Sequence, residues 1–152
     1  MTARDVVISS RVRLARNYED LPFDLAKSAE NAALNVTRTT GALRLEPGAE
    51  AFDLLQLRDL SPVQREDLAE SHLISRDLLA APDTAAVLLR REDAVSIMMN
   101  EEDHLRIQAI VPDMDLHTAA EKCFRVDDTL SRHVTFAFDQ QLGYLTACPT
   151  NT

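Results

Sequence analysis

The sequence predicts an α+β fold in which a mainly antiparallel sheet is flanked by helices. Segments with strand-like patterns outnumber those with helical patterns, and several strand-like segments follow one another directly along the chain. A chain of 152 residues, of which 45% are hydrophobic and only 3 are glycine, is long enough to bury one ordered core. We therefore expect a single domain over residues 1–152, with its helices on one face of the sheet.

The first third of the chain contains two expected strands and one helix. The run Val6-Val7-Ile8 favours a strand over residues 5–14, because β-branched side chains are enriched in strands. Alanines and a valine recur at helical spacing over residues 25–39, and Gly41 marks the expected end of that helix. The mostly apolar residues 52–57 are expected to form the next strand.

The second helix has the clearest local signal in the chain. Ser61 suits the N-cap, Pro62 suits the first helical position, and Gln64 completes a capping box. We therefore expect a helix to begin at this point and to run toward His72.

Strands dominate the rest of the chain. The expected segments are residues 85–89, 95–99, 105–110 and 143–148. The polar turn at residues 100–103 joins the second and third of these as a hairpin. Asp115 is a suitable N-cap for a third helix, in which apolar residues recur at helical spacing as far as Val134.

The charge and the cysteines exclude several classes of partner and site. The formal net charge is −9 and the pI is about 4.8, so the field of the whole protein disfavours binding to nucleic acid or to an anionic membrane. Cys123 and Cys148 are the only cysteines and lack metal-ligand spacing, which is typical of a reducing compartment. There is no apolar leader and no run of the roughly 18 apolar residues that a membrane helix needs, so we expect a cytoplasmic protein. Residues 113–117 resemble a sparse metal site, but an acidic helix start explains them better, and we assign no metal ligands.

Arginines gather near the amino terminus of this acidic chain. Because side chains alternate between the faces of a strand, Ser9, Arg11 and Arg13 are expected to point the same way. Guanidinium groups bind phosphate oxygens in a bidentate manner, so this face suits an oxyanion. The alternative is a solvated strand edge that carries positive charge. Since Arg4 and Arg16 add to the cluster in a chain with 25 acidic residues, we favour an oxyanion site.

Two further segments could carry chemistry. Residues 100–106 contain three carboxylates, an imidazole and a guanidinium, and Glu102, His104 and Arg106 share a face if the strand begins early. A carboxylate there could orient or deprotonate a cationic substrate while the arginine holds an anion. The alternative is an exposed hairpin tip whose ion pairs contribute little. Cys148 could contact a positive substrate group as a thiolate, or could be a small buried hydrophobic residue.

Four stretches, taken in order, resemble the guanidino kinase family, which includes arginine kinase and creatine kinase. The stretches are residues 7–17, 71–75, 97–108 and 143–151. The segments Asn100-Glu101-Glu102-Asp103-His104 and Cys148-Pro149-Thr150-Asn151 are specific to the family, whereas the Ser-x-Arg-x-Arg pattern alone is weak. The chain is most similar to the bacterial branch, the protein arginine kinases, because only a few residues precede the first strand.

The resemblance implies the N-terminal portion of a guanidino kinase catalytic domain, a glutamine synthetase-like half that stops after the Cys-Pro-Thr-Asn segment. The implied reaction is phosphoryl transfer from ATP to arginine side chains in proteins, with Mg²⁺ held through phosphates and water. Glu102 would orient and deprotonate the guanidinium and Cys148 would contact it. The residues implied on the nucleotide side are Arg11, Arg13 and Arg106 at the phosphates, together with His72. Ser9 and Asp103 match family positions near the site.

The same resemblance implies partners and limits. The implied partners are protein substrates that bear arginine and, in addition, a stress-response repressor and a Clp-type unfoldase. Family members continue through further phosphate-binding arginines, a second substrate carboxylate and a mobile loop, so we expect this chain alone to be inactive or weak. The alternative function is a non-catalytic regulatory module that binds nucleotide or phosphoarginine. A sheet cut partway would expose strand edges, which predicts self-association.

Overall fold

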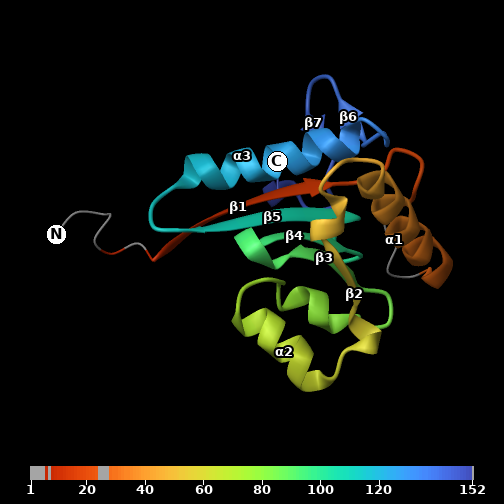
Figure 1. Ribbon diagram of the computed structural model, residues 1–152. Coiled ribbons are helices and arrows are strands. Elements are labelled where there is room, and N and C mark those ends of the chain that lie inside the picture. Colours follow the sequence, from red (N-terminus) through yellow and green to blue (C-terminus); the bar gives the residue numbers. More distant parts are fainter. Residues whose placement is uncertain (1–5, 7, 24–27, 152) are drawn as a thin grey trace.

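The computed structural model describes residues 6, 8–23 and 28–151, which form a five-stranded sheet flanked by helices (Figure 1). The spatial order of the strands is β1-β5-β4-β3-β2, and all neighbours are antiparallel. The strands are β1 (Ser9–Arg16), β2 (Asp53–Gln56), β3 (Ala86–Arg90), β4 (Val95–Met99) and β5 (Leu105–Pro112). The predicted α+β fold class is confirmed.

Three helices and a small hairpin complete the fold. The helices are α1 (Ala29–Arg44), α2 (Pro62–Glu70) and α3 (Leu116–Ser131), and the hairpin consists of β6 (Phe138–Asp139) and β7 (Gly143–Tyr144). Within the described ranges, no helix is long and apolar enough to cross a membrane.

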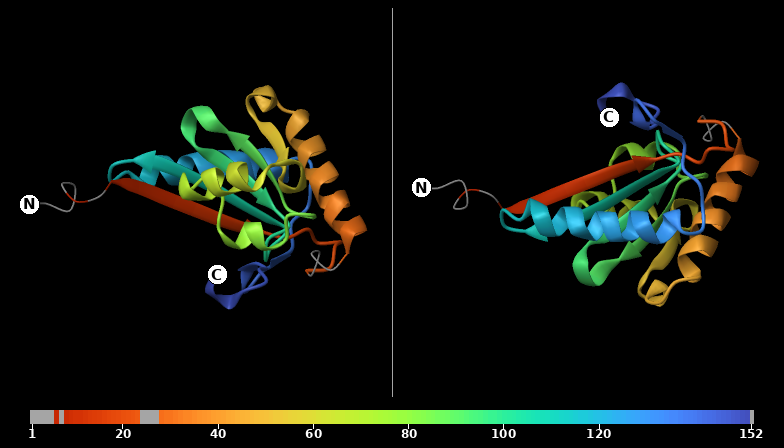
Figure 2. Two further views of the ribbon diagram at one scale, coloured as in Figure 1. Left: turned by 90° about the horizontal axis from the view of Figure 1, so that it is seen from below. Right: turned by 90° about the horizontal axis from the view of Figure 1, so that it is seen from above.

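The helices cover both faces of the sheet, so the prediction of helices on one face is wrong. Figure 2 shows α2 in front of the sheet in the view from below, and α3 in front of it in the view from above. The face toward α1 and α3 presents Leu88, Ile97 and Ile107, whereas the face toward α2 presents Val87 and Met98. Because β3 and β4 are apolar on both faces, each face needs its own cover. We refer to the two sides as the α3 face and the α2 face.

β1 begins later than predicted. Val6 and Ile8 lie before the strand and are 64% and 89% exposed, and the predicted positions 5 and 7 lie outside the described residues. β5 ends at the proline opposite the first residue of β1, and the chain then turns at Asp113, where φ is 61°. The main-chain nitrogen of Asp113 still donates a hydrogen bond to the main-chain oxygen of Ile8, but the turn at Asp113 ends the pairing there.

α1 runs past its predicted end. The helix continues through Gly41, and the following Ala42 and Leu43 are buried in the core beneath α1 and α3. Their burial offsets the cost of a glycine within a helix, which is about 1 kcal/mol. Residues 25–27, where this helix was predicted to begin, lie outside the described residues.

The side-chain caps of α2 and α3 are confirmed. The hydroxyl of Ser61 accepts a hydrogen bond from the main-chain nitrogen of Gln64 at 3.2 Å, and the Gln64 side chain accepts one from the main-chain nitrogen of Ser61 at 2.9 Å. Asp115 accepts a hydrogen bond from the main-chain nitrogen of Thr118 at 3.0 Å. These bonds satisfy N–H groups that have no partner within the helix, which is why local sequence sets these two helix starts.

Arg16 is a buried charged residue that joins β1 to α3. Its Nε and Nη2 each donate to the carboxylate of Asp127 at 2.8 Å, and the two side chains are 10% and 9% exposed. The guanidinium also lies over the ring of Tyr144, 3.6 Å from its centroid. One side chain therefore ties together β1, α3 and the β6–β7 hairpin.

We expect Asp127→Ala to lower the free energy of unfolding by about 3–5 kcal/mol, because the Arg16 charge would stay buried without its partner. The double variant Arg16→Met/Asp127→Leu is expected to lose less, since it leaves no unpaired charge. Urea unfolding at pH 7 measures both. Equal losses in the single and the double variant would contradict this account of the ion pair.

Candidate functional site

Four of the predicted site residues line one pocket on the α2 face. The pocket has a volume of about 450 Å³, and these residues are Arg11, Arg13, His72 and Arg106. The carboxylates in its lining belong to Glu70 and Asp77. We call it the arginine pocket. The structure thus brings together side chains from two strands and from the segment that follows α2.

The register of the sheet gathers the three guanidinium groups. Arg11 and Arg13 are exposed and alternate with more buried residues on β1, so both project from the α2 face. Arg106 projects from the same face of β5, where it lies opposite Ala15. The predicted common face of Ser9, Arg11 and Arg13 is therefore confirmed. Ser9 itself is not among the described residues that line the pocket.

Gln108 connects β1 to the segment after α2. Its side-chain oxygen accepts a hydrogen bond from Nε of Arg13 at 3.1 Å, and its amide nitrogen donates to the main-chain oxygen of His72 at 2.8 Å. His72 has a φ of 59°, a strained backbone conformation that surrounding contacts must hold. Sequence reasoning gave Gln108 no role in the site. The available signal was a glutamine within an expected strand. The structure shows that this side chain is fully buried, and a buried polar side chain needs hydrogen-bond partners.

Burial and neighbouring charges shift the pKa of Arg13. Partial burial lowers the pKa of Arg13, and the nearby charges of Arg11 and Arg106 lower it further, while Glu101 and Asp77 act in the opposite direction. Three like charges held on one face attract a polyanion, which would relieve their mutual repulsion.

Arg106 is paired with Glu101. The distance from Nη1 of Arg106 to Oε1 of Glu101 is 2.7 Å, and the two side chains are 12% and 4% exposed. The hydroxyl of Ser75 donates a hydrogen bond to the other carboxylate oxygen. Glu101 therefore orients Arg106 and ties the β4–β5 turn to the segment after α2.

The prediction that Glu102, His104 and Arg106 share a strand face is wrong. The strand does not begin early, because residues 100–104 form a turn in which Asn100 has a φ of 66°. Within this turn Glu102 is exposed, whereas His104 is 1% exposed. The predicted hairpin between β4 and β5 is confirmed.

Asp103 joins this turn to the segment that contains Cys148. Its Oδ1 accepts hydrogen bonds from the side-chain nitrogen of Asn17 and from the main-chain nitrogen of Ala147, each at 2.7 Å. Glu102 precedes Asp103 and Cys148 follows Ala147. The contact therefore holds the two predicted catalytic residues on neighbouring segments, although they are 46 positions apart in the sequence.

The strand predicted over residues 143–148 is confined to β7. Leu145 still donates to the main-chain oxygen of Ala137, but the backbone then leaves the hairpin for its contact with Asp103. Cys148 is partly exposed, and its Sγ lies 2.9 Å from the hydroxyl of Thr150. The alternative of a buried hydrophobic cysteine therefore fits Cys148 less well than an accessible thiol.

His104 connects the turn to the segment that follows β1. Its Nδ1 accepts a hydrogen bond from the main-chain nitrogen of Tyr18 at 2.9 Å, and its Nε2 lies 2.8 Å from the main-chain oxygen of Pro22. Together these contacts require a neutral ring with its proton on Nε2. Burial lowers the pKa of this imidazole, which favours the same neutral form.

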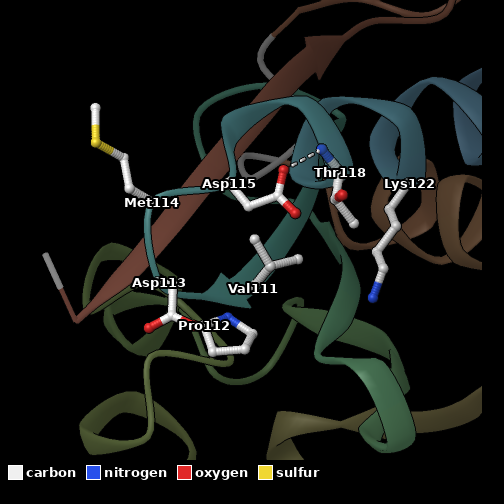
Figure 3. A pocket seen from close by; sticks show the side chains of 7 residues that line it. All are labelled: Val111, Pro112, Asp113, Met114, Asp115, Thr118 and Lys122. Atoms are coloured by element: carbon white, nitrogen blue, oxygen red, sulfur yellow. Dashed lines mark hydrogen bonds between the residues drawn. The ribbon is translucent and has the colours of Figure 1, made fainter. Parts of the chain in front are cut away.

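Residues 113–117 form the acidic helix start that was predicted. Figure 3 shows the carboxylate of Asp115 accepting a hydrogen bond from the main-chain nitrogen of Thr118, while the carboxylate of Asp113 points away from Asp115. Asp113, Met114 and Asp115 line an open pocket of about 700 Å³ together with Thr118 and Lys122. In the described part of the chain, no three side chains of His, Cys, Asp or Glu gather closely enough to hold a metal ion.

Comparison with known proteins identifies the family. A family profile described as "ATP:guanido phosphotransferase, C-terminal catalytic domain" matches residues 35–152. The chain belongs to this family. It is 49% identical over 150 residues to a protein-arginine kinase from Moorella thermoacetica, and 45% identical over 149 residues to one from Geobacillus thermodenitrificans. Both alignments cover 97% of the chain but only 43% and 41% of these protein-arginine kinases, so the chain spans about two fifths of their length.

Solved structures share the fold. The duplicated taurocyamine kinase from Schistosoma mansoni matches with a TM-score of 0.81 and 24% identity, over 95% of this chain and 22% of that one. A lombricine kinase matches with a TM-score of 0.78 and 22% identity, over 95% of this chain and 44% of that one. The guanidino kinase fold predicted from sequence is confirmed.

We expect the stability of the chain to fall as the pH drops below about 6.5, the ordinary pKa of histidine. Because burial lowers the folded-state pKa of His104, the unfolded chain takes up this proton first. The stabilisation is therefore fully present above that pH and is lost progressively toward the lower folded-state pKa. Urea unfolding measured across this range gives the slope.

His104→Gln should flatten that slope, whatever its effect on stability at neutral pH. The matched control is His117→Gln, since the His117 side chain is 85% exposed and should leave the slope unchanged. If the His104 variant kept the slope of the unmodified chain, the neutral buried imidazole would not be its source.

Proposed function

We propose that the protein transfers the terminal phosphoryl group of ATP to a guanidino nitrogen, with arginine side chains of proteins as acceptors. Family membership supports the reaction class. The observation that supports it most directly is the arginine pocket, in which Arg11, Arg13 and Arg106 line one cavity. Arg106 is paired with Glu101, which precedes Glu102 in the same turn.

The arginine pocket suits the donor. Each guanidinium offers several N–H groups in one plane, a geometry that matches phosphate oxygens. Glu101 orients Arg106 and Gln108 orients Arg13, and each of these guanidinium groups has further N–H groups for the nucleotide. His72 would lie on the nucleotide side of the same pocket. Because the transferring phosphoryl group spreads its charge over several oxygens, positioned cations supply much of the stabilisation.

The neighbouring turn suits the acceptor. A guanidinium is a poor nucleophile because it is protonated and delocalised at neutral pH, so a carboxylate must orient it and remove a proton. Glu102 is exposed and has no hydrogen bond or ion pair among the described residues, so its carboxylate is available for this role. Cys148, held nearby through Asp103 and Ala147, would contact the same guanidinium.

Mg²⁺ would be bound through the nucleotide phosphates and water. The lining of the arginine pocket fits this arrangement, because it is mainly cationic and its carboxylates, Glu70 and Asp77, do not belong to any cluster of three ligands in the described part of the chain. When bound, the ion would neutralise phosphate charge.

Protein-bound arginine is favoured over small guanidino compounds by similarity. The two protein-arginine kinases are 49% and 45% identical to this chain, whereas the taurocyamine and lombricine kinases are 24% and 22% identical.

We expect Arg11→Ala to weaken binding of MgADP to the 152-residue chain by about 10- to 100-fold. A charge-assisted hydrogen bond contributes about 1.5–3 kcal/mol, and each 1.4 kcal/mol is about tenfold in affinity. The matched control is Arg44→Ala, which removes an exposed arginine outside the pocket. Titration calorimetry at pH 7 and constant salt gives the three affinities. Equal affinities for the unmodified chain and Arg11→Ala would argue against a phosphate site here.

We expect Glu102→Gln to weaken binding of an arginine-containing peptide to the MgADP-saturated chain by about tenfold or more, because a carboxylate–guanidinium pair is lost. MgADP affinity should not change, and Glu92→Gln, at an exposed carboxylate outside the turn, is the control. The same peptide with lysine in place of arginine should bind weakly. Tight binding of phosphoarginine by a chain that binds no nucleotide would favour a regulatory module instead.

A further inference from the structure

A second pocket lies on the α3 face, on the other side of the sheet from the arginine pocket. It has a volume of about 210 Å³ and is enclosed by the end of α1, the segment before β2, the β3–β4 connection and α3. We call it the Phe52 pocket. Its lining includes Leu43, Glu46, Phe52, Arg90, Asp93, Lys122, Arg125 and Val126. None of them lines the arginine pocket.

The inner wall of the Phe52 pocket is apolar. Leu43 and Val126 are 4% and 5% exposed and belong to the core beneath α1 and α3, and Phe52 packs against the same core. The guanidinium of Arg90 lies over the ring of Phe52, 4.8 Å from its centroid. Such a wall suits the hydrocarbon part of a small organic ligand.

The outer wall carries an excess of positive charge. Arg90 forms two hydrogen bonds with the carboxylate of Asp93, at 2.7 and 2.9 Å, and Nζ of Lys122 lies 3.3 Å from the same carboxylate. One carboxylate thus serves two cations, which leaves one positive charge unbalanced. Arg125, three residues beyond Lys122 on α3, adds a further cation and is exposed.

The other carboxylate in the lining does not cancel this excess. Glu46 is bonded to His133 at 2.7 Å and to Arg132 at 3.1 Å, so its charge is already balanced by its own partners. The His133 hydrogen bond, with a smaller contribution from Arg132, lowers the pKa of Glu46. Burial alone would raise the pKa of Asp93, but the hydrogen bonds from Arg90 and Lys122 outweigh it and leave this pKa lowered. Both carboxylates are therefore ionised at neutral pH.

We propose that the Phe52 pocket binds a phosphate monoester with a small apolar body. The phosphate would lie against Lys122 and Arg125, and the apolar part against Phe52 and Val126. A phosphate monoester carries about 1.5 to 2 negative charges at pH 7, which matches the two unbalanced cations better than a carboxylate does. A local excess of positive charge in a chain of net charge −9 is not expected from composition alone.

Phenyl phosphate, inorganic phosphate and benzoate are the probes. Each is titrated into the ¹⁵N-labelled 152-residue chain, with backbone amide shifts as the readout. We expect phenyl phosphate to shift the amides of Phe52, Lys122 and Arg125 in one saturable phase, and to bind at least tenfold more tightly than benzoate. Inorganic phosphate should bind at the same place more weakly, because it lacks the apolar part.

Variants separate this pocket from other cationic surfaces. Arg125→Ala should weaken phenyl phosphate at least tenfold, whereas Arg91→Ala, an exposed arginine next to Arg90 but outside the lining, should not change it. Arg11→Ala should leave the shifts around Phe52 intact, since that side chain lies in the arginine pocket. Shifts confined to the arginine pocket, unchanged affinity in Arg125→Ala, or equal binding of benzoate would each overturn the proposal.

Discussion

Antiparallel pairing of β1 with β5 is the constraint on which the candidate site depends. The register sets Arg13 opposite Gln108 and Ala15 opposite Arg106, so the arginines of both strands emerge from the same face. The same register turns Val12 and Leu14 toward the core beneath α3. Because side chains alternate, a slip of one residue would expose those apolar side chains and bury the arginines. The register that buries the core is therefore the same register that assembles the arginine pocket.

Alternation along β1 also places its arginines on two different faces of the sheet, where they have different roles. Arg11 and Arg13 differ by an even step and share the α2 face, whereas Arg16 is an odd step away and enters the opposite side. There its pairing with Asp127 and its contact with Tyr144 are structural. The residue after it, Asn17, bonds Asp103 and so reaches the turn of Glu102. One short segment thus supplies both the cations of the pocket and the support of the neighbouring turn.

Local patterns predicted most of the elements and part of the site. Alternation on β1 was enough to align Ser9, Arg11 and Arg13, and side-chain caps were enough to start α2 and α3. The pairing of Arg106 with Glu101 was not predictable, because it depends on the backbone of the turn at Asn100 rather than on residue spacing.

Other features depend on contacts between distant segments. Gln108 becomes important only because His72 is brought above it, and β7 ends early only because Asp103 captures the following backbone. Helices cover both faces because residues 85–89 and 95–99 carry apolar side chains on both faces of the sheet, with Ser96 as the one polar exception. The contacts of Gln108 and Asp103, by contrast, leave no periodic trace in the sequence.

The separation between Arg13 and Gln108, 95 positions along the chain, has a consequence for the order of folding. The β3–β4 and β4–β5 hairpins join residues that are close in sequence, so they can form before β1 finds its place. β1 lies at the edge of the sheet and pairs with β5, which is far away in the sequence. Docking of β1 therefore closes the largest loop among the strand pairs of this sheet. Under the proposed function, a phosphate ligand of Arg11, Arg13 and Arg106 would bind only chains in which β1 has docked on β5. Such a ligand would therefore stabilise the docked position of β1.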